Sequence, residues 1–530
     1  MTRMTVRLAV LLAAVSVVPV VPQGNVSLAG QVEDEKGQAL HGVLVSAKSG
    51  RKTVTVVTKF DGRYTIGDLA PGSYDVKAVR EGYSTASQKV TLPASSPVQF
   101  TLKPGSFDPT RLSWADMEKA LPVHPFKKQL MDCQICHSWN GLAAQRPHRT
   151  EDWVNGMKLM ARTGWARFND ADIPKMAEYL QTHFGADAKL NVKLPPEPVD
   201  ERGLNIKYVA FDIPSYHAMP HTAVPDGKGT VWFTEYGANK IGRLNPKSGQ
   251  MEEFPTPGAV RQSPHGLTVD NKGIVWFTSQ TAGEIGRFDP TTKTFKAYKI
   301  PSPTNKVQGR QGVVSEGANM RREVATHTLI PDNKGHIWFT AGANPLMKLN
   351  PETGEVSEYV IREGGGGLYG VTFDAKNNRV WYAGLGISEV GYVNPDTGKI
   401  SHFPMLTPNA GPRRLHVDSK GVAWCNLYNV SKIARIDPST GRVTEWDLPG
   451  GRDGLPYALG LDHKERVWTT TYRNDQLHMF DPKTEKFVSY VMPTKGNGMR
   501  DFYVDENGWV WAVAWGHNQV VAFKLDEPVN

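Results

Sequence analysis

A short strand pattern built around tryptophan recurs at a nearly constant interval through the last three fifths of the chain, and it restricts the possible fold more than any other feature. Its seven tryptophans are Trp232, Trp276, Trp338, Trp381, Trp424, Trp468 and Trp511. They are 44, 62, 43, 43, 44 and 43 residues apart. A period of about 40–45 residues with several strands per unit is typical of β-propellers. The sequence therefore predicts a seven-bladed β-propeller over residues 205–530, with an insertion near residues 301–322.

The two ends of the repeat array predict how the ring closes. An Asn-Pro or Asp-Pro pair marks the turn after the third strand in each of the first six units, beginning with Asn245-Pro246. A fourth strand follows that turn, but the last unit stops near Phe523 without one. A strand pattern from Tyr208 to Pro214 precedes the first unit and supplies the missing strand. We expect this N-terminal strand to complete the last blade and remove its exposed edge.

Residues 24–103 read as a small all-β unit. Apolar and polar residues alternate in residues 28–32, and turn signals such as Pro71-Gly72 separate the runs. Residues 61–66 (DGRYTI) and 69–76 (LAPGSYDV) resemble the carboxypeptidase regulatory-like domain. The resemblance implies a transthyretin-like β-sandwich of seven or eight strands that has no catalytic activity and serves as a spacer or docking module.

Residues 104–196 read as a small helical unit that ends in a linker. Helix-start signals occur at Ser113, at Thr150 and at Asn169-Asp170, each before a run with helical character. The proline-rich stretch 193–198 (KLPPEP) is expected to be stiff and extended. The chain is therefore expected to be multidomain and mainly β, with one all-α unit between two β units.

The run Cys133-Gln134-Ile135-Cys136-His137 lies inside the helical unit. In a C-x-x-C-H motif two thiols add to the two vinyl groups of a haem, and the adjacent His supplies one axial nitrogen to iron. A redox dithiol or a chance match is the alternative, and neither needs the following His. The sequence predicts one covalent haem c, attached through Cys133 and Cys136, with His137 as an iron ligand.

The second axial ligand is expected to be a methionine, because a thioether suits electron transfer. Met157 and Met160 follow Trp153 at i+4 and i+7, on one helical face. Met176 shares a face with apolar residues, which indicates core packing. Residues 133–185 resemble the small cytochrome c domains of multidomain periplasmic dehydrogenases in bacteria. That resemblance implies Met160 as the iron ligand, with Met157 second.

Residues 1–23 read as an export signal. Arg3 and Arg7 precede an apolar run from Leu8 to Val21, which is too short to span a bilayer comfortably. No later stretch is long and apolar enough for a membrane helix. We expect a periplasmic or secreted protein without a membrane span.

The net charge of +8 is not gathered into a dense Lys/Arg stripe interleaved with aromatic residues, which argues against a nucleic acid partner. The mild excess suits docking to an acidic partner protein, although a solvated surface explains it equally well. Of the three cysteines, Cys425 stands alone after Trp424, so no disulfide framework is expected. We interpret Cys425 as a small buried residue of a strand.

One ring of equivalent positions should surround the central channel of the propeller. The position lies eleven residues before the Trp of six units and twelve before that of the fourth, and it holds His221, His265, His327, Tyr369, Arg413, Tyr457 and Arg500. All seven side chains are large and polar or titratable. Such a ring can bind an anion, hold a metal through neutral imidazoles or supply a general base. The alternative is a polar, water-filled funnel without a substrate.

The repeats themselves resemble those of virginiamycin B lyase (streptogramin lyase). The resemblance lies in residues 264–278 (PHGLTVDNKGIVWFT) and 232–244 (WFTEYGANKIGRL), and it spans about residues 205–525. It implies a mouth that binds Mg²⁺ through acidic residues, with a His as general base in eliminative opening of a cyclic ester. The matching catalytic positions are His221, Glu235 and His265.

The match at these catalytic positions is partial. The acidic residue that the resemblance implies two positions before His221 is Met219 here. In the next unit Ser263 and Ser279 stand at the corresponding places.

Three functions remain open from the sequence. The first is electron transfer between a haem domain and a small-molecule substrate or partner protein bound at the propeller mouth. The second is a metal-dependent lyase, and the third is a noncatalytic binding or sensor protein. The placement of the helical unit relative to the mouth would discriminate most strongly among them.

Overall fold

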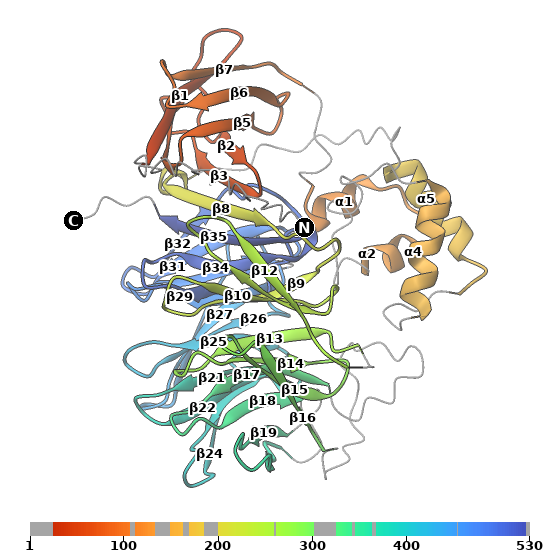
Figure 1. Cartoon of the computed structure of the whole chain (residues 1–530), viewed down its shortest axis with the longest axis vertical. Coiled ribbons are helices and arrows are strands. Elements are labelled where there is room, and N and C mark those ends of the chain that lie inside the picture. Colours follow the sequence, from red (N-terminus) through yellow and green to blue (C-terminus); the bar gives the residue numbers. More distant parts are fainter. Residues whose placement is uncertain are drawn as a thin grey trace, which may run out of the picture.

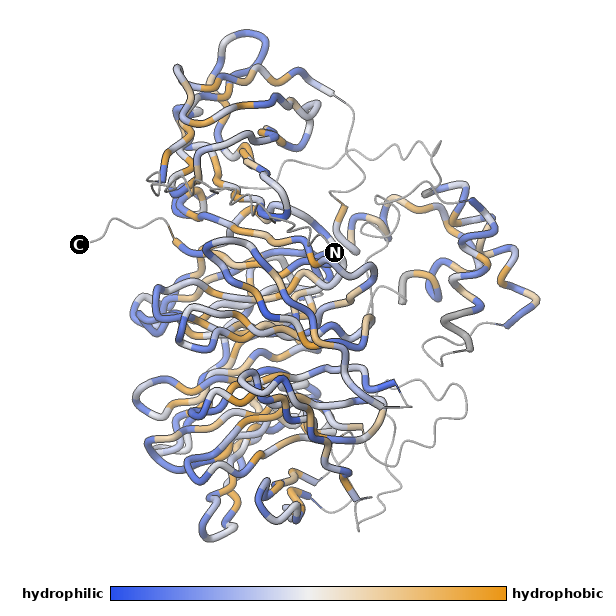
Figure 2. Tube along the Cα trace, viewed as in Figure 1, coloured by the Kyte–Doolittle hydropathy of each residue, from blue (hydrophilic) through white to orange (hydrophobic). Residues whose placement is uncertain are grey.

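The computed structural model describes residues 25–105, 112–132, 149–162, 169–184, 200–258, 261–301, 325–341, 345–362, 367–452 and 454–525. Within these ranges the protein is a mainly β, multidomain chain with few helices, as the sequence predicts. Figure 1 shows a small β unit at one end, a large stack of sheets, and a group of helices to one side of that stack. Figure 2 shows apolar segments concentrated where the strands pack together.

The N-terminal unit packs two sheets against each other. One sheet has the order β4-β1-β7, and the other contains β3, β2, β5 and β6. The strands are β1 (Val26–Asp34), β2 (Leu44–Ser49), β3 (Lys52–Val57), β4 (Arg63–Leu69), β5 (Gly72–Val79), β6 (Ala86–Leu92) and β7 (Val98–Leu102). Buried and exposed residues alternate along β7, as expected for strands with one face on a core. The Tyr64 hydroxyl donates to the Val98 carbonyl at 2.8 Å and ties the edges of β4 and β7 together.

Six four-stranded antiparallel sheets and part of a larger sheet make up the repeat region. They are built from β9 (Pro220–Pro225), β10 (Val231–Glu235), β11 (Lys240–Leu244), β12 (Met251–Pro255), β13 (Pro264–Val269), β14 (Val275–Ser279), β15 (Glu284–Asp289), β16 (Thr294–Lys299), β17 (Thr326–Pro331), β18 (Ile337–Ala341), β19 (Leu346–Leu349), β20 (Val356–Tyr359), β21 (Leu368–Asp374), β22 (Arg379–Gly384), β23 (Glu389–Val393), β24 (Ile400–Pro404), β25 (Pro412–Val417), β26 (Ala423–Leu427), β27 (Lys432–Asp437), β28 (Arg442–Asp447), β29 (Pro456–Leu461), β30 (Val467–Thr471), β31 (Gln476–Asp481), β32 (Lys486–Tyr490), β33 (Tyr503–Val504), β34 (Val510–Ala514) and β35 (Gln519–Leu525). Consecutive strands pair within each sheet, which is the arrangement of propeller blades.

The repeated tryptophan anchors each sheet. All seven indoles are buried in the second strand of their sheets. In five of them the indole N–H donates to an aspartate six residues earlier, at 2.8–3.3 Å; these pairs are Trp276–Asp270, Trp338–Asp332, Trp424–Asp418, Trp468–Asp462 and Trp511–Asp505. A buried indole needs such an acceptor, so the aspartate belongs to the repeat signature as much as the tryptophan does.

Strand β8 (Ile206–Asp212) lies between two parts of the chain that are far apart in sequence. On one side it pairs antiparallel with β35, from Gln519↔Asp212 to Leu525↔Ile206, as the sequence predicts. On its other side it pairs with β3 of the N-terminal unit, from Lys52↔Phe211 to Val56↔Lys207. One eight-stranded sheet, β33-β34-β35-β8-β3-β2-β5-β6, therefore runs through both units (Figure 1). The sequence does not predict the pairing of β8 with β3, because no periodic pattern links strands about 150 residues apart.

Polar contacts at the edges of this junction reinforce it. Lys48 Nζ and Asp212 Oδ2 lie 2.7 Å apart. Lys207 Nζ contacts the Asp68 carboxylate and the Gly67 carbonyl, both at 3.0 Å. The two units also share one hydrophobic core, in which Val54 and Phe211 are members. The N-terminal unit is thus fixed to the propeller rather than tethered to it.

The helices form a separate group beside the sheets. They are α1 (Trp114–Ala120), α2 (Lys127–Asp132), α4 (Thr150–Arg162) and α5 (Ile173–Phe184). The Ser113 side chain caps α1 by accepting from the Asp116 N–H at 3.2 Å, and Asp116 accepts from the Ser113 N–H at 3.1 Å. The helix start expected at Ser113 is confirmed, whereas α4 already begins at Thr150 and α5 begins at Ile173, three residues after Asp170. In the described part of the chain, none of the helices has the length and apolar character that crossing a membrane requires.

The continuous sheet leads to a prediction for Val54→Pro. Proline in an internal strand removes a ladder hydrogen bond, which is why it is found essentially only on edge strands or at bulges. Because β3 is internal, we expect Val54→Pro to lower Tm and to speed hydrogen exchange in β8 as well as in β3. The control is Ser87→Pro in β6, which lies at the end of the sheet order. Unchanged exchange in β8 after Val54→Pro would show that the two units do not share a sheet.

Candidate functional site

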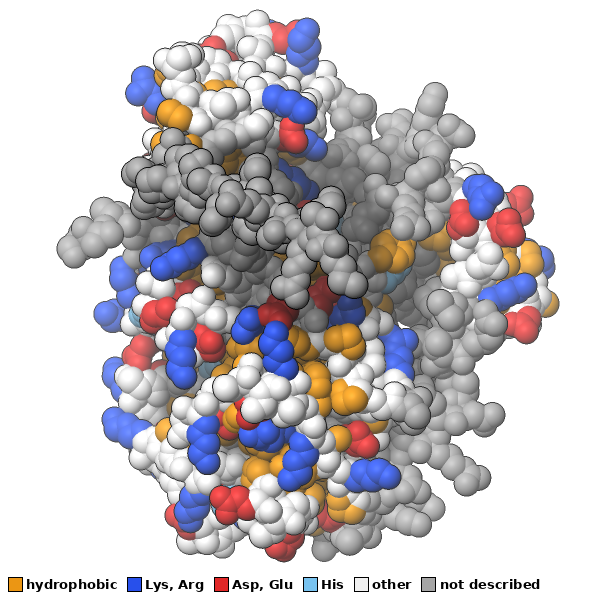
Figure 3. All heavy atoms as spheres, in the orientation of Figure 1, with side chains coloured by type: hydrophobic (Ala, Val, Ile, Leu, Met, Phe, Trp, Pro, Cys, Tyr) orange, Lys and Arg blue, Asp and Glu red, His pale blue; other side chains and the backbone are white. Residues whose placement is uncertain are grey.

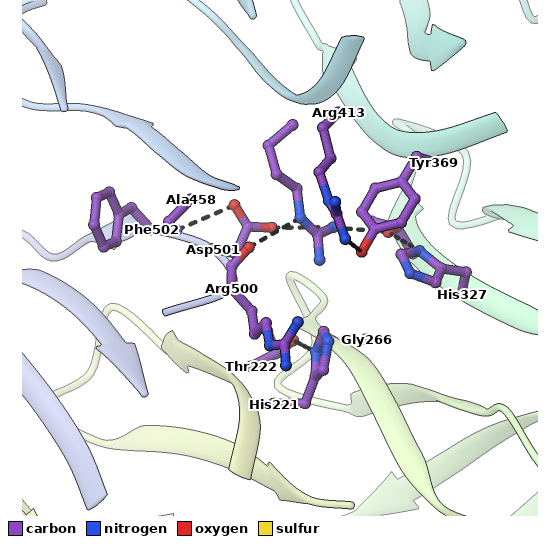
Figure 4. Close-up of polar contacts among 12 residues, drawn as sticks. His221, Thr222, Gly266, His327, Tyr369, Arg413, Ala458, Arg500, Asp501 and Phe502 are labelled. Atoms are coloured by element: carbon purple, nitrogen blue, oxygen red, sulfur yellow. Dashed lines mark hydrogen bonds and ion pairs between the residues drawn. The ribbon is translucent and has the colours of Figure 1, made fainter. Parts of the chain in front are cut away.

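The seven ring positions identified from the repeat spacing occupy equivalent places in the structure. His221, His265, His327, Tyr369, Arg413 and Tyr457 are each the second residue of the innermost strand, in β9, β13, β17, β21, β25 and β29. Arg500 precedes the short innermost strand β33. In all six longer strands the register with the second strand shifts next to the ring residue. Such β-bulges re-aim side chains, here toward the common centre shown in Figure 4.

Three imidazoles form one arc of this ring. The ring centroids of His221 and His265 are 3.4 Å apart, and those of His265 and His327 are 4.3 Å apart. The His327 ring lies 4.0 Å from that of Tyr369. Burial lowers the pKa of all three imidazoles well below the usual value, and the charges of neighbouring histidines and arginines add to the effect. The arc is therefore neutral at physiological pH.

Arginine and tyrosine form the opposite arc. The Arg413 guanidinium carbon lies 3.6 Å from the Tyr457 ring centroid, 4.1 Å from that of Tyr428 and 4.4 Å from that of Tyr369. Arg413 Nη2 donates to the Tyr369 hydroxyl at 2.9 Å, and the hydroxyls of Tyr369 and Tyr457 are hydrogen-bonded to each other. Burial opposes ionisation of Tyr457, but the charges of Arg413 and Arg500 outweigh it and lower the pKa of that phenol.

Arg500 lies between the histidine arc and the arginine–tyrosine arc and connects them. Its guanidinium carbon lies 4.8 Å from the ring centroid of Tyr457, 5.1 Å from that of Tyr472 and 4.7 Å from that of Trp515. The Trp515 ring is in turn 5.8 Å from that of His221. The structure therefore brings all seven predicted ring residues into one network.

A buried ion pair lies within the same network. Arg414 Nη1 lies 3.4 Å from Asp501 Oδ2 and donates to Thr328 Oγ1 at 2.8 Å, and Arg414 Nε donates to the Arg500 carbonyl at 3.1 Å. Arg414 and Asp501 are 3% and 6% exposed. Burial opposes ionisation of Asp501, yet Arg414 and His416 hold its pKa below the usual range.

Arg414, Asp501, Tyr428, Tyr472 and Trp515 belong to the network but were not predicted from the sequence. Each lies one residue after a ring position or one residue after the end of a strand. Counting back from each tryptophan does not identify these positions. The adjacent pair Arg413-Arg414 was the one sequence signal for this set. No other unit has two neighbouring arginines at the start of its inner strand.

Glu235 does not join the two histidines with which the sequence grouped it. It ends β10, is fully buried, and neither of its carboxylate oxygens has a hydrogen-bond partner in the structure. The neighbouring Tyr236 faces the mouth instead, with its ring 6.1 Å from that of His265. Side chains alternate along a strand, so Glu235 lies on the other side, beside Glu253 and Lys240. Burial, reinforced by the charge of Glu253, raises the pKa of Glu235 to about 8.

The mouth does not fit the Mg²⁺ that the family resemblance implies. Mg²⁺ prefers carboxylate and water oxygens in octahedral geometry. Around His221 and His265 the structure provides imidazoles, guanidinium groups and phenols. Throughout the ranges that the structure describes, no group of three or more His, Cys, Asp or Glu residues could hold a metal ion.

The helical unit docks on this mouth. The Trp114 ring of α1 meets that of Tyr472 edge-on, with centroids 6.1 Å apart. The Ala115 N–H donates to the Arg473 carbonyl at 3.0 Å, and Arg473 forms an ion pair with Glu118. Tyr457 and Tyr472 belong to the same hydrophobic cluster as the helical residues Trp114, Met117, Leu130, Trp153, Met157, Ile173, Met176 and Leu180. Mouth and helical unit thus share one core.

The residues predicted to attach haem lie partly outside the described chain. Cys133, Cys136 and His137 fall in the range 133–148, immediately after α2, and lie outside the described residues. Met160 belongs to α4, but its side chain is outside the description. Met157 and Met176 are buried in the helical core at 1% and 0% exposure, which is the core-packing role considered for them.

The raised pKa of Glu235 predicts that Glu235→Gln stabilises the protein. The folded state keeps the proton up to about pH 8, whereas the unfolded chain releases it above the usual value of 4.5. Stability is therefore lost as pH rises between these values, by about 3 kcal/mol at pH 7. We expect Glu235→Gln to raise Tm at pH 7.5 and to have little effect at pH 4.5. Glu252→Gln, at the exposed pair with Lys293, is the control; a lower Tm for Glu235→Gln at pH 7.5 would contradict the assignment.

Solved structures with the same fold come from streptogramin-inactivating enzymes. A streptogramin B lyase structure is 23% identical, with a TM-score of 0.53, and covers 62% of this chain and 100% of its own. Selenomethionine-substituted virginiamycin B lyase from Staphylococcus aureus is 22% identical, with a TM-score of 0.52, and covers 60% and 99%. A catalytically inactive histidine-to-alanine variant of that enzyme, solved with quinupristin, matches equally well. These identities establish a shared propeller-like fold and nothing about activity.

Family models match both β units of the chain. The carboxypeptidase regulatory-like domain matches residues 27–103, which confirms the interpretation of the N-terminal unit. The virginiamycin B lyase family matches residues 203–309 and 306–530. No curated protein matches the sequence. Because the second model covers more than half of the chain, this protein belongs to the virginiamycin B lyase family and carries a carboxypeptidase regulatory-like domain near its N-terminus.

Proposed function

We propose that this is a periplasmic c-type haem protein in which a helical cytochrome c unit exchanges electrons with a small molecule or partner protein at the mouth of a seven-bladed propeller. The six four-stranded sheets together with β33-β34-β35-β8 would form the seven blades. The N-terminal segment 1–23 would direct export, and covalent haem attachment takes place outside the cytoplasm. The two units would then act as one electron-transfer protein.

Docking of the helical unit on the propeller mouth is the observation that carries this proposal. A tethered, independent carrier would need no shared core, yet Trp114 and Leu130 pack in one cluster with Tyr457 and Tyr472. The Ala115–Arg473 hydrogen bond and the Glu118–Arg473 ion pair fix the orientation of α1 on that surface. We infer that a group attached beyond α2 would lie near the ring network.

The chain provides the residues that a haem c requires. Cys133 and Cys136 would form the two thioether bonds, and His137 and Met160 would ligate the iron. The group would supply one-electron transfer at a potential tuned by its axial ligands and by the polarity of its surroundings.

The ring network would bind the reaction partner. Its neutral imidazoles provide proton acceptors at His221, His265 and His327, and its guanidinium groups provide fixed positive charge at Arg413 and Arg500. Aromatic rings line the arc that faces α1. This combination suits a planar or anionic molecule better than a cation. On the face of the molecule in Figure 3, basic and acidic side chains are interspersed, which suits a protein partner better than a nucleic acid.

Covalent haem attachment is the first test. In a host competent for cytochrome c maturation, we expect the purified protein to give one haem per chain by the pyridine haemochrome assay, with a matching mass increase. Cys133→Ala and Cys136→Ala together should abolish both signals, because no thiol is left to add to the vinyl groups. Cys425→Ala, which removes the buried cysteine of the propeller, should leave both unchanged. A colourless native protein without the added mass would disprove the proposal.

Family membership favours a second candidate, a lyase that opens a cyclic ester at the same mouth. In an elimination a base removes a proton from the α carbon, which bears a carbonyl group. The electron pair forms a double bond to the adjacent β carbon, and the bond between that β carbon and the ester oxygen breaks to release a carboxylate. His221 or His265, both neutral, could accept that proton. The missing carboxylate set around them weighs against a metal-assisted version.

A cyclic depsipeptide such as quinupristin tests this second candidate. Elimination yields a linear isomer of unchanged mass, whereas hydrolysis adds one water, so chromatography with mass detection separates the two. A lyase of the family type would lose its activity in His265→Ala, in Glu235→Ala and on treatment with a chelator, but not in Glu252→Ala. From the geometry of Glu235 we expect no ring opening by the native protein. A linear isomer formed in a chelator-sensitive, Glu235-dependent way would establish the lyase instead.

A further inference from the structure

The guanidinium group of Arg413 is a buried positive charge without a carboxylate partner in the structure. Its side chain is 8% exposed. Among the described residues its side chain makes one hydrogen bond, from Nη2 to the Tyr369 hydroxyl, and its buried Nε has no partner. A guanidinium group carries five N–H donors in a planar fork, so most of its capacity is unused. Buried charges without a counter-charge are costly, which makes this arrangement unusual for a purely structural residue.

No carboxylate among the described residues supplies a counter-charge to Arg413. Asp501 is the acidic residue of this network, and it is already committed to Arg414 at 3.4 Å and to His416 at 3.6 Å. What surrounds Arg413 instead is a set of three phenol rings, from Tyr369, Tyr428 and Tyr457. Cation–π contacts of this kind stack a guanidinium group against aromatic rings without using its hydrogen-bond donors.

This environment matches the recognition of a carboxylate. A carboxylate is planar and accepts two parallel hydrogen bonds from one guanidinium group. Aromatic side walls select for a flat or apolar body attached to that carboxylate. The Tyr369 hydroxyl is bonded to that of Tyr457 and accepts from Arg413, and the neutral arc of His221, His265 and His327 adds no competing charge.

We propose that Arg413, framed by Tyr369, Tyr428 and Tyr457, is the anchor of a carboxylate-binding site at the propeller mouth. The carboxylate has two possible sources, a free organic acid or a propionate of the haem attached to this same chain. The second source rests on the proposed function, whereas the first does not. The chemistry recognised at Arg413 is the same for both.

The position of α2 is compatible with a haem propionate as the carboxylate bound at Arg413. Leu130 of α2 packs in the cluster that contains Tyr457 and Tyr472. Cys133 follows Leu130 by three residues in the sequence. A haem attached there would come close to the mouth tyrosines.

A titration with benzoate tests the free-acid source on the haem-loaded protein. Isothermal titration calorimetry should give measurable binding of benzoate and at least tenfold weaker binding of benzamide, which has the same shape without the charge. Arg413→Gln should weaken benzoate binding at least tenfold. Arg442→Gln, which removes an exposed arginine of β28, should leave it unchanged.

Proton uptake gives a second readout that does not depend on Arg413 variants. The positive charges around Tyr457 favour its phenolate, and a bound carboxylate would cancel part of that effect. At pH 8 benzoate binding should therefore take up protons, seen as a dependence of the heat on the ionisation enthalpy of Tris or HEPES buffer. Tyr457→Phe should remove that dependence. This readout remains informative if Arg413→Gln does not fold.

The haem midpoint potential tests the intramolecular source. If a propionate occupies Arg413, benzoate does not bind the haem-loaded protein, and the potential of Arg413→Gln falls and becomes dependent on pH between 5 and 8. Arg442→Gln should show neither change. Either Arg413-dependent benzoate binding or this Arg413-specific change in potential supports the carboxylate site.

The site is overturned if neither effect occurs, or if benzamide binds as tightly as benzoate. Absence of haem in the purified protein would defeat the proposed function separately. The benzoate titration would still decide whether Arg413 binds a carboxylate, so the two failures are distinguishable.

Discussion

The backbone pairing of β8 on both of its edges is the constraint on which the rest of the structure depends. One edge completes the sheet that contains β35, so the first and last parts of the repeat region are held together. The other edge accepts β3, so an otherwise exposed sheet edge is covered by the N-terminal unit. With the ends joined, the inner strands are held in a common register, and one position in each can face a shared centre.

That shared centre has a neutral half, made of imidazoles, and a positively charged half, made of guanidinium groups. The two kinds of side chain respond differently to burial. Imidazoles lose their charge when they are packed against one another and against arginines, whereas a guanidinium group keeps its charge under any burial that a protein imposes. The positive charge of the mouth is therefore concentrated beside the tyrosines, on the side where α1 docks. The side chain of Glu235 lies on the opposite side of its strand from the mouth, where burial keeps it protonated.

This mouth differs from the magnesium site that the family resemblance implies. Repeat geometry preserves the place where a ligand can bind, but the chemistry depends on which side chains occupy that place. Here two arginines and two tyrosines fill four of the seven ring positions, and the carboxylates expected of a magnesium-dependent site are absent from the described residues around His221 and His265. The added helical unit then supplies a partner surface directly above the ring.

The amino-acid sequence by itself determined the repeat period, the ring positions, the helix starts and the pairing of β8 with β35. The period, the ring positions and the helix starts depend on local spacing, because a tryptophan period or a capping residue is legible within a few tens of residues. The pairing of β8 with β35 joins the two ends of the repeat region, and the strand count predicts it because the last unit lacks the strand that precedes the first. Tertiary structure alone decided that β3 joins the same sheet, that Arg414 and Asp501 pair within the mouth, and that α1 docks on Tyr472 and Arg473. These contacts join segments between about 90 and 360 residues apart. They are selected by the fit of buried surfaces and charges, which no pattern along a single chain encodes.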